Sequence, residues 1–164
     1  MPNSMLDSPF RCCLPEEEFL LVNSHTIEEM HSYRGYAMGF LPNYPCISKL
    51  MVALGLESEK RHESLVTAAQ GLGLEKKLRD QEICPDLLAK LQGQFFFVTD
   101  DEITRVTLIQ VLVTSLNSWL FYKLMLDSCG SHELNVLLQD FVAQQRNVYR
   151  TLEEVQNAWI DTMA

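Results

Sequence analysis

The sequence is poor in the residues that interrupt regular secondary structure. Its 164 residues include only seven glycines and six prolines. Long segments therefore run without a helix-breaking residue. A content of 47% hydrophobic and 21% charged residues is typical of one folded domain with a substantial core and excludes a disordered chain. The composition and the long periodic segments together predict an all-α fold.

Positive charge is also scarce. Thirteen lysines and arginines stand against 22 aspartates and glutamates, and the formal net charge is −9. Proteins that bind nucleic acids or anionic membrane surfaces carry an excess of positive charge. We therefore expect no nucleic-acid partner and no membrane partner. The sequence also lacks any run of 18 apolar residues, so we expect no membrane-spanning helix.

Cysteine motifs are absent as well. The five cysteines are odd in number and scattered, with no Cys-x-x-Cys pair. This pattern predicts reduced thiols. Residues 1–15 contain Asp7 and Arg11 and no apolar run, so we expect no secretory signal and a cytoplasmic location. The adjacent Cys12 and Cys13 are consistent with a redox pair, a metal contact or, as we favour, two ordinary thiols.

Four long segments have the periodicity of amphipathic helices. Pro15 and Pro45 suit the first turn of a helix, and Thr99 with Glu102 forms a predicted capping box. The predicted helices cover residues 15–40, 46–70, 99–127 and 132–162. The connections between them are short, long and short. We expect an irregular arm over residues 1–14 and a helical bundle over 15–164, with a crossover at 71–98 that holds one or two short helical pieces, for example 85–91.

The candidate functional residues are charged groups at helix positions that should be buried. Glu59 and His62 lie three residues apart and share one predicted face with Val52 and Val66. A buried carboxylate and imidazole need partners, either a metal ion or a salt bridge. Glu29 lies on the apolar stripe of the first helix. Because Glu29 and Glu59 are both 15 residues from Tyr44 in the predicted turn, two antiparallel helices should place them at one level.

This pattern resembles the ferritin-like superfamily, most nearly its rubrerythrin-type di-iron carboxylate branch, over roughly residues 16–160. Such bundles have one long crossover among short loops. The resemblance implies one Glu ligand from the first helix, matched by Glu29, and a Glu-x-x-His motif from the second, matched by Glu59 and His62. It also implies a bound iron or manganese ion and a metal-binding or oxidoreductase function.

The second half of the sequence departs from that family pattern. No acidic residue lies between Glu102 and Asp127, where the positions facing mid-bundle hold Ser115 and Asn117. On the fourth helix Gln145 stands at the expected Glu position, and Val148 stands at the His position. A di-iron centre needs about four carboxylates, so we expect at most one ion. Without metal, Gln145 or Asn117 should donate amide hydrogen bonds in place of the absent ligands.

Two alternatives follow at both the residue and the protein level. His25, one turn before Glu29, either replaces a missing ligand or bonds a neighbouring backbone group, which we favour. In the first alternative, the protein is a metal-binding protein or oxidoreductase that uses Glu29, Glu59 and His62. In the second, it is a non-catalytic ferritin-like scaffold that lost its di-iron centre and binds a small molecule or a protein partner.

The third predicted helix is apolar on nearly every side. Leu108, Leu112, Trp119 and Leu126 point in different directions around it. One apolar stripe is enough for a four-helix core, and the crossover can cover only part of the surplus. Large apolar patches are rare on monomers. The sequence therefore predicts a homodimer formed through this helix.

Overall fold

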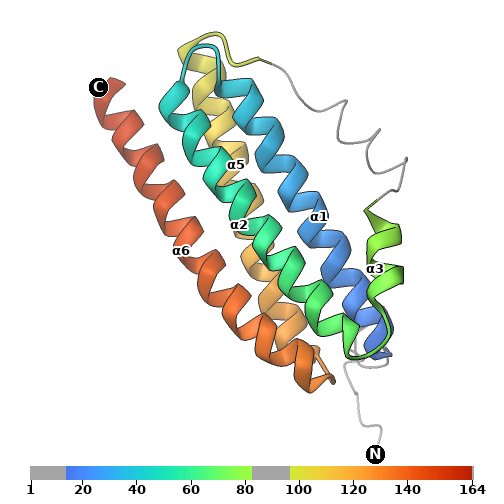
Figure 1. Ribbon diagram of the computed structural model, residues 1–164. Coiled ribbons are helices and arrows are strands. Elements are labelled where there is room, and N and C mark those ends of the chain that lie inside the picture. The colour runs from blue at the N-terminus through green and yellow to red at the C-terminus, as the bar shows by residue number, and fades with distance from the viewer. Residues whose placement is uncertain (1–13, 83–96, 164) are drawn as a thin grey trace, which may run out of the picture.

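A computed structural model describes residues 14–82 and 97–163, and within these ranges it is all helical (Figure 1). This confirms the all-α prediction. The helices are α1 (Pro15–Phe40), α2 (Pro45–Gln70), α3 (Glu75–Gln81), α5 (Asp101–Ser128) and α6 (His132–Met163). None of these helices is long and apolar enough to cross a lipid bilayer.

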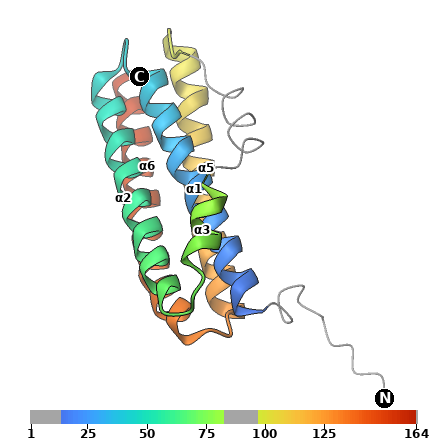
Figure 2. The same cartoon turned by 45° about the vertical axis from the view of Figure 1, so that its right-hand side comes forward.

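Four long helices lie side by side and form the body of the molecule (Figures 1 and 2). The helices α1 and α2 form one antiparallel pair, and α5 and α6 form the other. Consecutive long helices joined by a short connection pack antiparallel. The helices α2 and α5 run in the same direction, because the chain returns to the other end of the body between them. The short helix α3 lies in that return and packs beside α1.

The helix starts follow from local chemistry. Helix α1 begins at Pro15, and three glutamates occupy its first turn, at the positive end of the helix dipole. The Leu14 N–H donates to the Glu17 carboxylate at 3.3 Å. Helix α2 begins at Pro45, one residue earlier than predicted. After α2 the backbone turns at Gly73, whose φ of 70° is accessible to glycine at no steric cost.

Two details of the sequence prediction were wrong or incomplete. The N-cap of α5 is Asp100, not Thr99, because the Asp100 carboxylate accepts the Ile103 N–H at 2.8 Å. The position of α3 within the crossover was not predicted, since its seven residues are too few to show periodicity. The predicted helical piece at 85–91 lies outside the described residues, as does the predicted arm except for its last residue.

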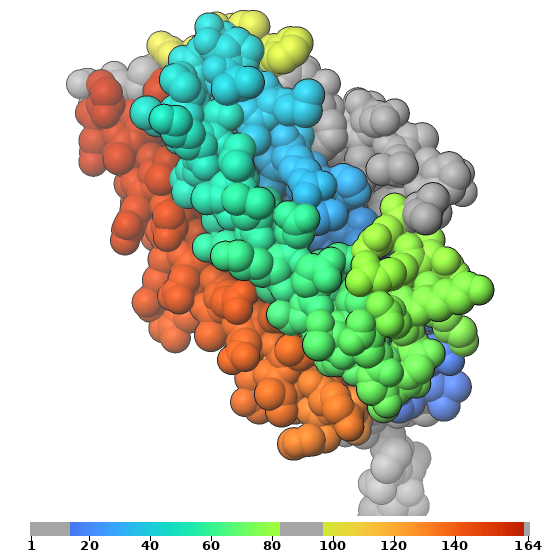
Figure 3. All heavy atoms as spheres, in the orientation of Figure 1, coloured from blue at the N-terminus to red at the C-terminus, as the bar shows by residue number. Residues whose placement is uncertain are grey.

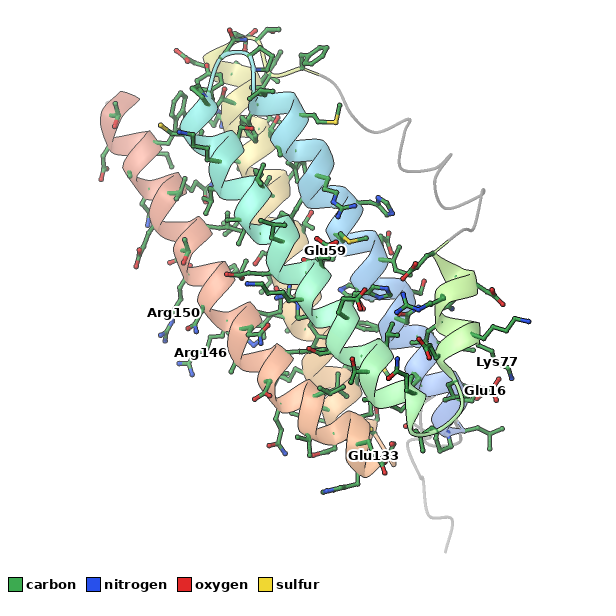
Figure 4. All side chains as sticks on the ribbon, in the orientation of Figure 1. Glu16, Glu59, Lys77, Glu133, Arg146 and Arg150 are labelled. Carbon is green, nitrogen blue, oxygen red and sulfur yellow. The ribbon has the colours of Figure 1, made fainter. Side chains whose placement is uncertain are left out.

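Side-chain hydrogen bonds fasten α3 to α1. The buried Asn23 amide of α1 donates to the Leu78 carbonyl at 3.0 Å and to the Gln81 side chain at 2.7 Å. Leu78 itself is fully buried. At the surface, Lys77 pairs with Glu16, as Figure 4 shows. One short helix is therefore held by an apolar anchor, a buried amide and an ion pair.

Polar contacts tie the elements together at both ends of the body. At one end the buried Glu18 carboxylate accepts the Gly130 N–H at 3.2 Å, which links α1 to the α5–α6 connection. At the other end the Val98 N–H donates to the Gly39 carbonyl at 2.9 Å. This bond places the start of α5 beside the α1–α2 turn, and it satisfies backbone groups that burial would otherwise leave unpaired.

The core consists of two apolar clusters separated by a polar layer. The first cluster includes Phe19, Val22, Leu65, Ala69, Tyr122, Met125, Leu134, Leu138 and Phe141. The second includes Tyr33, Phe40, Met51, Leu54, Leu108, Val111, Val148 and Leu152. Between them, at mid-bundle, each long helix contributes a buried polar residue. These are Glu29, Ser58, Arg61, Ser115, Ser118 and Gln145.

The Asp100 cap can be tested directly. Replacing Asp100 with Ala removes the acceptor for the Ile103 N–H, so the free energy of unfolding should fall by about 1 kcal/mol. Thr99→Ala is the matched control and should change it by less than about 0.5 kcal/mol. Urea unfolding followed by circular dichroism measures both. A larger loss for Thr99→Ala than for Asp100→Ala would contradict the cap assignment.

Candidate polar centre of the bundle

The polar layer is organised around the carboxylate of Glu29, which is 2% exposed. Arg61 of α2 forms a buried ion pair with Glu29 Oε1. Ser58 Oγ donates to the same oxygen at 2.7 Å. Gln145 of α6 donates its side-chain N–H to both carboxylate oxygens at 3.1 Å. Two helices, α2 and α6, therefore supply donors to the one carboxylate of α1.

The position of Arg61 follows from the apolar spacing of α2. Met51, Leu54 and Leu65 are buried, and Leu54 and Leu65 are three helical turns apart. Ser58 and Arg61 fill the turns between them on the same face. Serine is small, so α1 and α2 approach closely there and the long Arg61 side chain reaches the Glu29 carboxylate.

The charge of the pair is set by this environment. Burial by itself raises the pKa of Glu29, but Arg61 and the hydrogen bonds to the carboxylate outweigh it, so the pKa of Glu29 lies below its usual value. Burial likewise lowers the pKa of Arg61, and Glu29 more than offsets that effect. Both groups are ionised, and each is the counter-charge of the other.

The structure places Glu59 at the surface, away from Glu29. The Glu59 side chain is 46% exposed, and its carboxylate lies 3.5 Å from the guanidinium of Arg34 on α1. Figure 4 shows Glu59 labelled between α1 and α2, on the outside. Its predicted level along the bundle is right, because Glu29 contacts its neighbour Ser58. The predicted face is right for His62 and Val66, which are buried, and wrong for Val52 and Glu59, because the buried stripe of α2 is centred nearer Ser58 and Arg61.

His62 is buried, as expected, but it faces another partner. Its Nε2 atom forms a short contact with the carboxylate of Glu82, just after α3. His62 therefore helps to hold the α2–α3 connection on the side of the bundle. The expected convergence of Glu29, Glu59 and His62 is not present, since each of the three has a different partner.

The donor set at mid-bundle does not fit a metal ion. In residues 14–82 and 97–163, no group of three or more His, Cys, Asp and Glu side chains is arranged to hold one. Glu29 contributes a single carboxylate, and the groups around it are donors: a guanidinium, a hydroxyl and an amide N–H. Metal ligands must be acceptors. The ion pair with Arg61 also compensates the charge of Glu29, so this carboxylate has no net charge left to bind a metal ion.

His25 has a structural partner, as favoured from the sequence, although that partner is a side chain. Its Nε2 atom lies 2.9 Å from Ser118 Oγ, and its ring stacks on Phe121 with centroids 4.1 Å apart. Burial lowers the pKa of His25. The imidazole is therefore neutral near pH 7, and it lies 3.9 Å from the second oxygen of Glu29.

A polar pocket of about 310 Å³ opens between α1 and α5. It is lined by His25, Glu28, Glu29, Ser32, Tyr36, Thr114, Asn117 and Ser118. Asn117, which the sequence placed at mid-bundle, is exposed and lies in this lining. Two carboxylates and no lysine or arginine belong to this lining. Arg61 compensates Glu29 from the other side, so Glu28 is the negative charge of the pocket that the lining leaves uncompensated.

A second opening lies between α2 and α6, on the face seen in Figure 3. This groove has a volume of about 390 Å³, and Arg61 lines it together with Lys60 and Glu57. The Arg61 guanidinium also donates to the Gln144 side chain at 3.2 Å. The ion pair thus spans the core, with Glu29 toward the pocket and Arg61 toward the groove.

Sequence reasoning missed Arg61 as a buried partner. A signal for it was present, since Arg61 is seven residues after Leu54 and four before Leu65, which is the spacing of one helical face. The Glu-x-x-His spacing led to the prediction of His62, the next residue, instead. Gln145 was placed correctly: it is fully buried and donates to Glu29, as predicted for a bundle without metal.

Comparison with known proteins gives no further assignment. The chain matches no protein-family model, no curated protein and no solved structure. The ferritin-like resemblance therefore rests on the sequence pattern alone and stays a prediction.

The buried pair makes a clear thermodynamic prediction. Arg61→Met leaves the Glu29 carboxylate buried without its counter-charge, so the free energy of unfolding should fall by about 3–5 kcal/mol. The double variant Glu29→Gln/Arg61→Met removes both charges and should recover most of that loss.

The surface pair of the same two helices is the control. Arg34→Met breaks the contact with Glu59 and should change the free energy of unfolding by about 0–1 kcal/mol. Chemical denaturation of the four proteins measures these values. Equal losses for Arg34→Met and Arg61→Met would show that the Glu29 pair is not buried as described.

Proposed function

We propose that this protein is a non-catalytic helical scaffold that binds a small organic cation in the pocket between α1 and α5. The contact of Arg61 with Glu29 is the observation that supports a non-catalytic scaffold. In di-iron carboxylate bundles the mid-bundle carboxylates face metal ions. Here a guanidinium supplies the positive charge from within the chain, so the bundle needs no ion to compensate Glu29.

The helix order supports a ferritin-like ancestry for this scaffold. Two antiparallel helix pairs joined by a long return, with α2 and α5 parallel, match the arrangement of ferritin-like bundles. The polar layer lies where those bundles carry their ligands. This is an analogy of architecture and does not by itself assign an activity. We propose that the chain keeps the bundle and not the metal chemistry.

The chemistry of the pocket supports a cationic ligand. Glu28 contributes a negative charge that no lysine or arginine of the lining compensates, and His25 is neutral near pH 7 because burial lowers its pKa. The hydroxyls of Ser32 and Thr114 and the amide of Asn117 add hydrogen-bonding groups at the wall. An ammonium group would be attracted by Glu28 and would meet acceptors on several sides, whereas an anion would be repelled by Glu28.

The second candidate function is a metal-dependent oxidoreductase with one iron or manganese ion. Its support is the buried Glu29 with the nearby His25, together with the Glu-x-x-His motif in the sequence. The donor groups that already surround Glu29 weigh against it. Metal analysis separates the two candidates.

We expect the purified protein to contain much less than one iron or manganese ion per chain by elemental analysis. Excess Mn²⁺ should give no saturable rise in the melting temperature, because a ligand stabilises a protein only if it binds the folded state. One ion per chain, lost in Glu29→Gln and kept in the surface control Glu59→Gln, would establish the oxidoreductase candidate instead.

Ligand charge can be tested with two probes of equal length. Putrescine and succinate each have four carbons and differ in the sign of their terminal groups. Isothermal titration calorimetry should detect binding of putrescine and not of succinate, because the pocket wall has an uncompensated carboxylate, Glu28, and no lysine or arginine.

The binding should depend on the pocket wall. Glu28→Gln removes one carboxylate and should weaken putrescine binding by about tenfold. Glu57→Gln, in the groove between α2 and α6, is the matched control and should leave it unchanged. Equal binding of the two probes, or equal losses in the two variants, would contradict the proposed site.

A further inference from the structure

The surface of α5 has an unusual distribution of polarity. The buried residues of this helix include Thr104, Thr107, Ser115, Ser118 and Tyr122, all of which carry a hydroxyl. The residues on the opposite side include exposed valines, isoleucine and leucines. A helix packed only within this chain should have the reverse arrangement, with apolar residues inward and polar residues outward.

The exposed apolar residues form one straight stripe. Along α5 it consists of Val106, Ile109, Val113, Leu116 and Leu120, of which Leu116 is half-buried and the others are exposed. They recur at intervals of three and four residues in alternation. This is the heptad spacing of a helix that packs along its length against a second helix. We call these five residues the α5 seam.

The seam differs from the residues that the sequence analysis selected for an interface. Leu108 is buried in the core. Trp119 is half-buried and packs against Tyr149 of α6, with ring centroids 5.8 Å apart. These side chains are used within the subunit, and the surplus apolar surface of α5 is the seam.

The geometry points to a second copy of this chain as the occupant: we propose that two α5 helices pair antiparallel about a two-fold axis at Val113. The seam is close to symmetric about this residue: Val106 and Leu120 lie seven residues on either side of it, while Ile109 lies four residues before it and Leu116 three after it. In an antiparallel pair with this axis, Val106 meets Leu120 of the other copy and Val113 meets itself, and Ile109 and Leu116 are offset from each other by one residue. A two-fold interface requires such a self-complementary patch.

The charges at the ends of the seam favour the antiparallel direction. The same axis brings Lys123 of one copy within one residue of the level of Glu102 of the other, and the exposed Glu102 carboxylate also contacts its own Arg105. A parallel pair would instead place Glu102 against Glu102 and Lys123 against Lys123, which is repulsive. The axis also lies near the middle of Asp101–Ser128, so the two helices overlap along almost their full length.

The mass in solution tests the proposal, which is independent of the ligand pocket and of any metal. Sedimentation equilibrium at micromolar concentration should give twice the chain mass of 18.8 kDa. Val113→Glu places two like charges on the axis and should return the mass to that of one chain. Val136→Glu on α6 is the matched control, because Val136 is 50% exposed and Val113 is 49% exposed. It should leave the dimer intact.

Mixing two variants tests the symmetry itself. Val113→Glu and Val113→Lys should each be monomeric, and an equimolar mixture should recover the dimer, because only a residue that meets its own copy gives this behaviour. Circular dichroism checks that each variant stays helical. A monomeric wild-type protein, a dimeric Val113→Glu variant or a mixture that stays monomeric would each overturn the proposed pairing.

Discussion

The buried ion pair between Glu29 and Arg61 is the interaction on which the rest of the core depends. A carboxylate in an apolar interior is unfavourable unless it is paired and hydrogen-bonded. Here the counter-charge comes from α2 and the remaining donors come from Ser58 and Gln145. These contacts require α1, α2 and α6 to be in one axial register, since a shift between α1 and α2 by one turn leaves a charge unpaired and a shift of α6 removes the Gln145 hydrogen bonds. The pair therefore favours one arrangement over other equally apolar packings.

The same pair explains why the two sides of the bundle differ. Glu29 lines the pocket between α1 and α5, and Arg61 lines the groove between α2 and α6. The neutral imidazole of His25 adds no positive charge on the Glu29 side. The negative member of the ion pair thus lies toward the pocket, and the positive member lies toward the groove.

Most of the fold could be predicted from helical periodicity, because the helices of the bundle bury regular stripes of residues. The stripe of α6 through Leu138, Gln145 and Leu152 was predicted correctly. The site was harder to predict from the sequence, since a shift of one position around α2 decides whether Glu59 or Ser58 is buried. A short motif cannot resolve that shift, whereas the spacing of Leu54 and Leu65 can. Glu82, the partner of His62, comes after the α2–α3 turn in the sequence, so no helical periodicity relates the two residues.

The polarity of α5 ties the polar layer to the assembly of the protein. Ser115 and Ser118 face the interior because large apolar side chains there would displace Glu29, His25 and their partners. The inner face of α5 consequently contributes less apolar burial than is usual for a core helix. The outer face has the aliphatic residues instead, and burying them against a second α5 would restore the missing apolar contact. On this argument the charged centre and the dimer seam are two consequences of one constraint, namely that α5 packs against a polar layer.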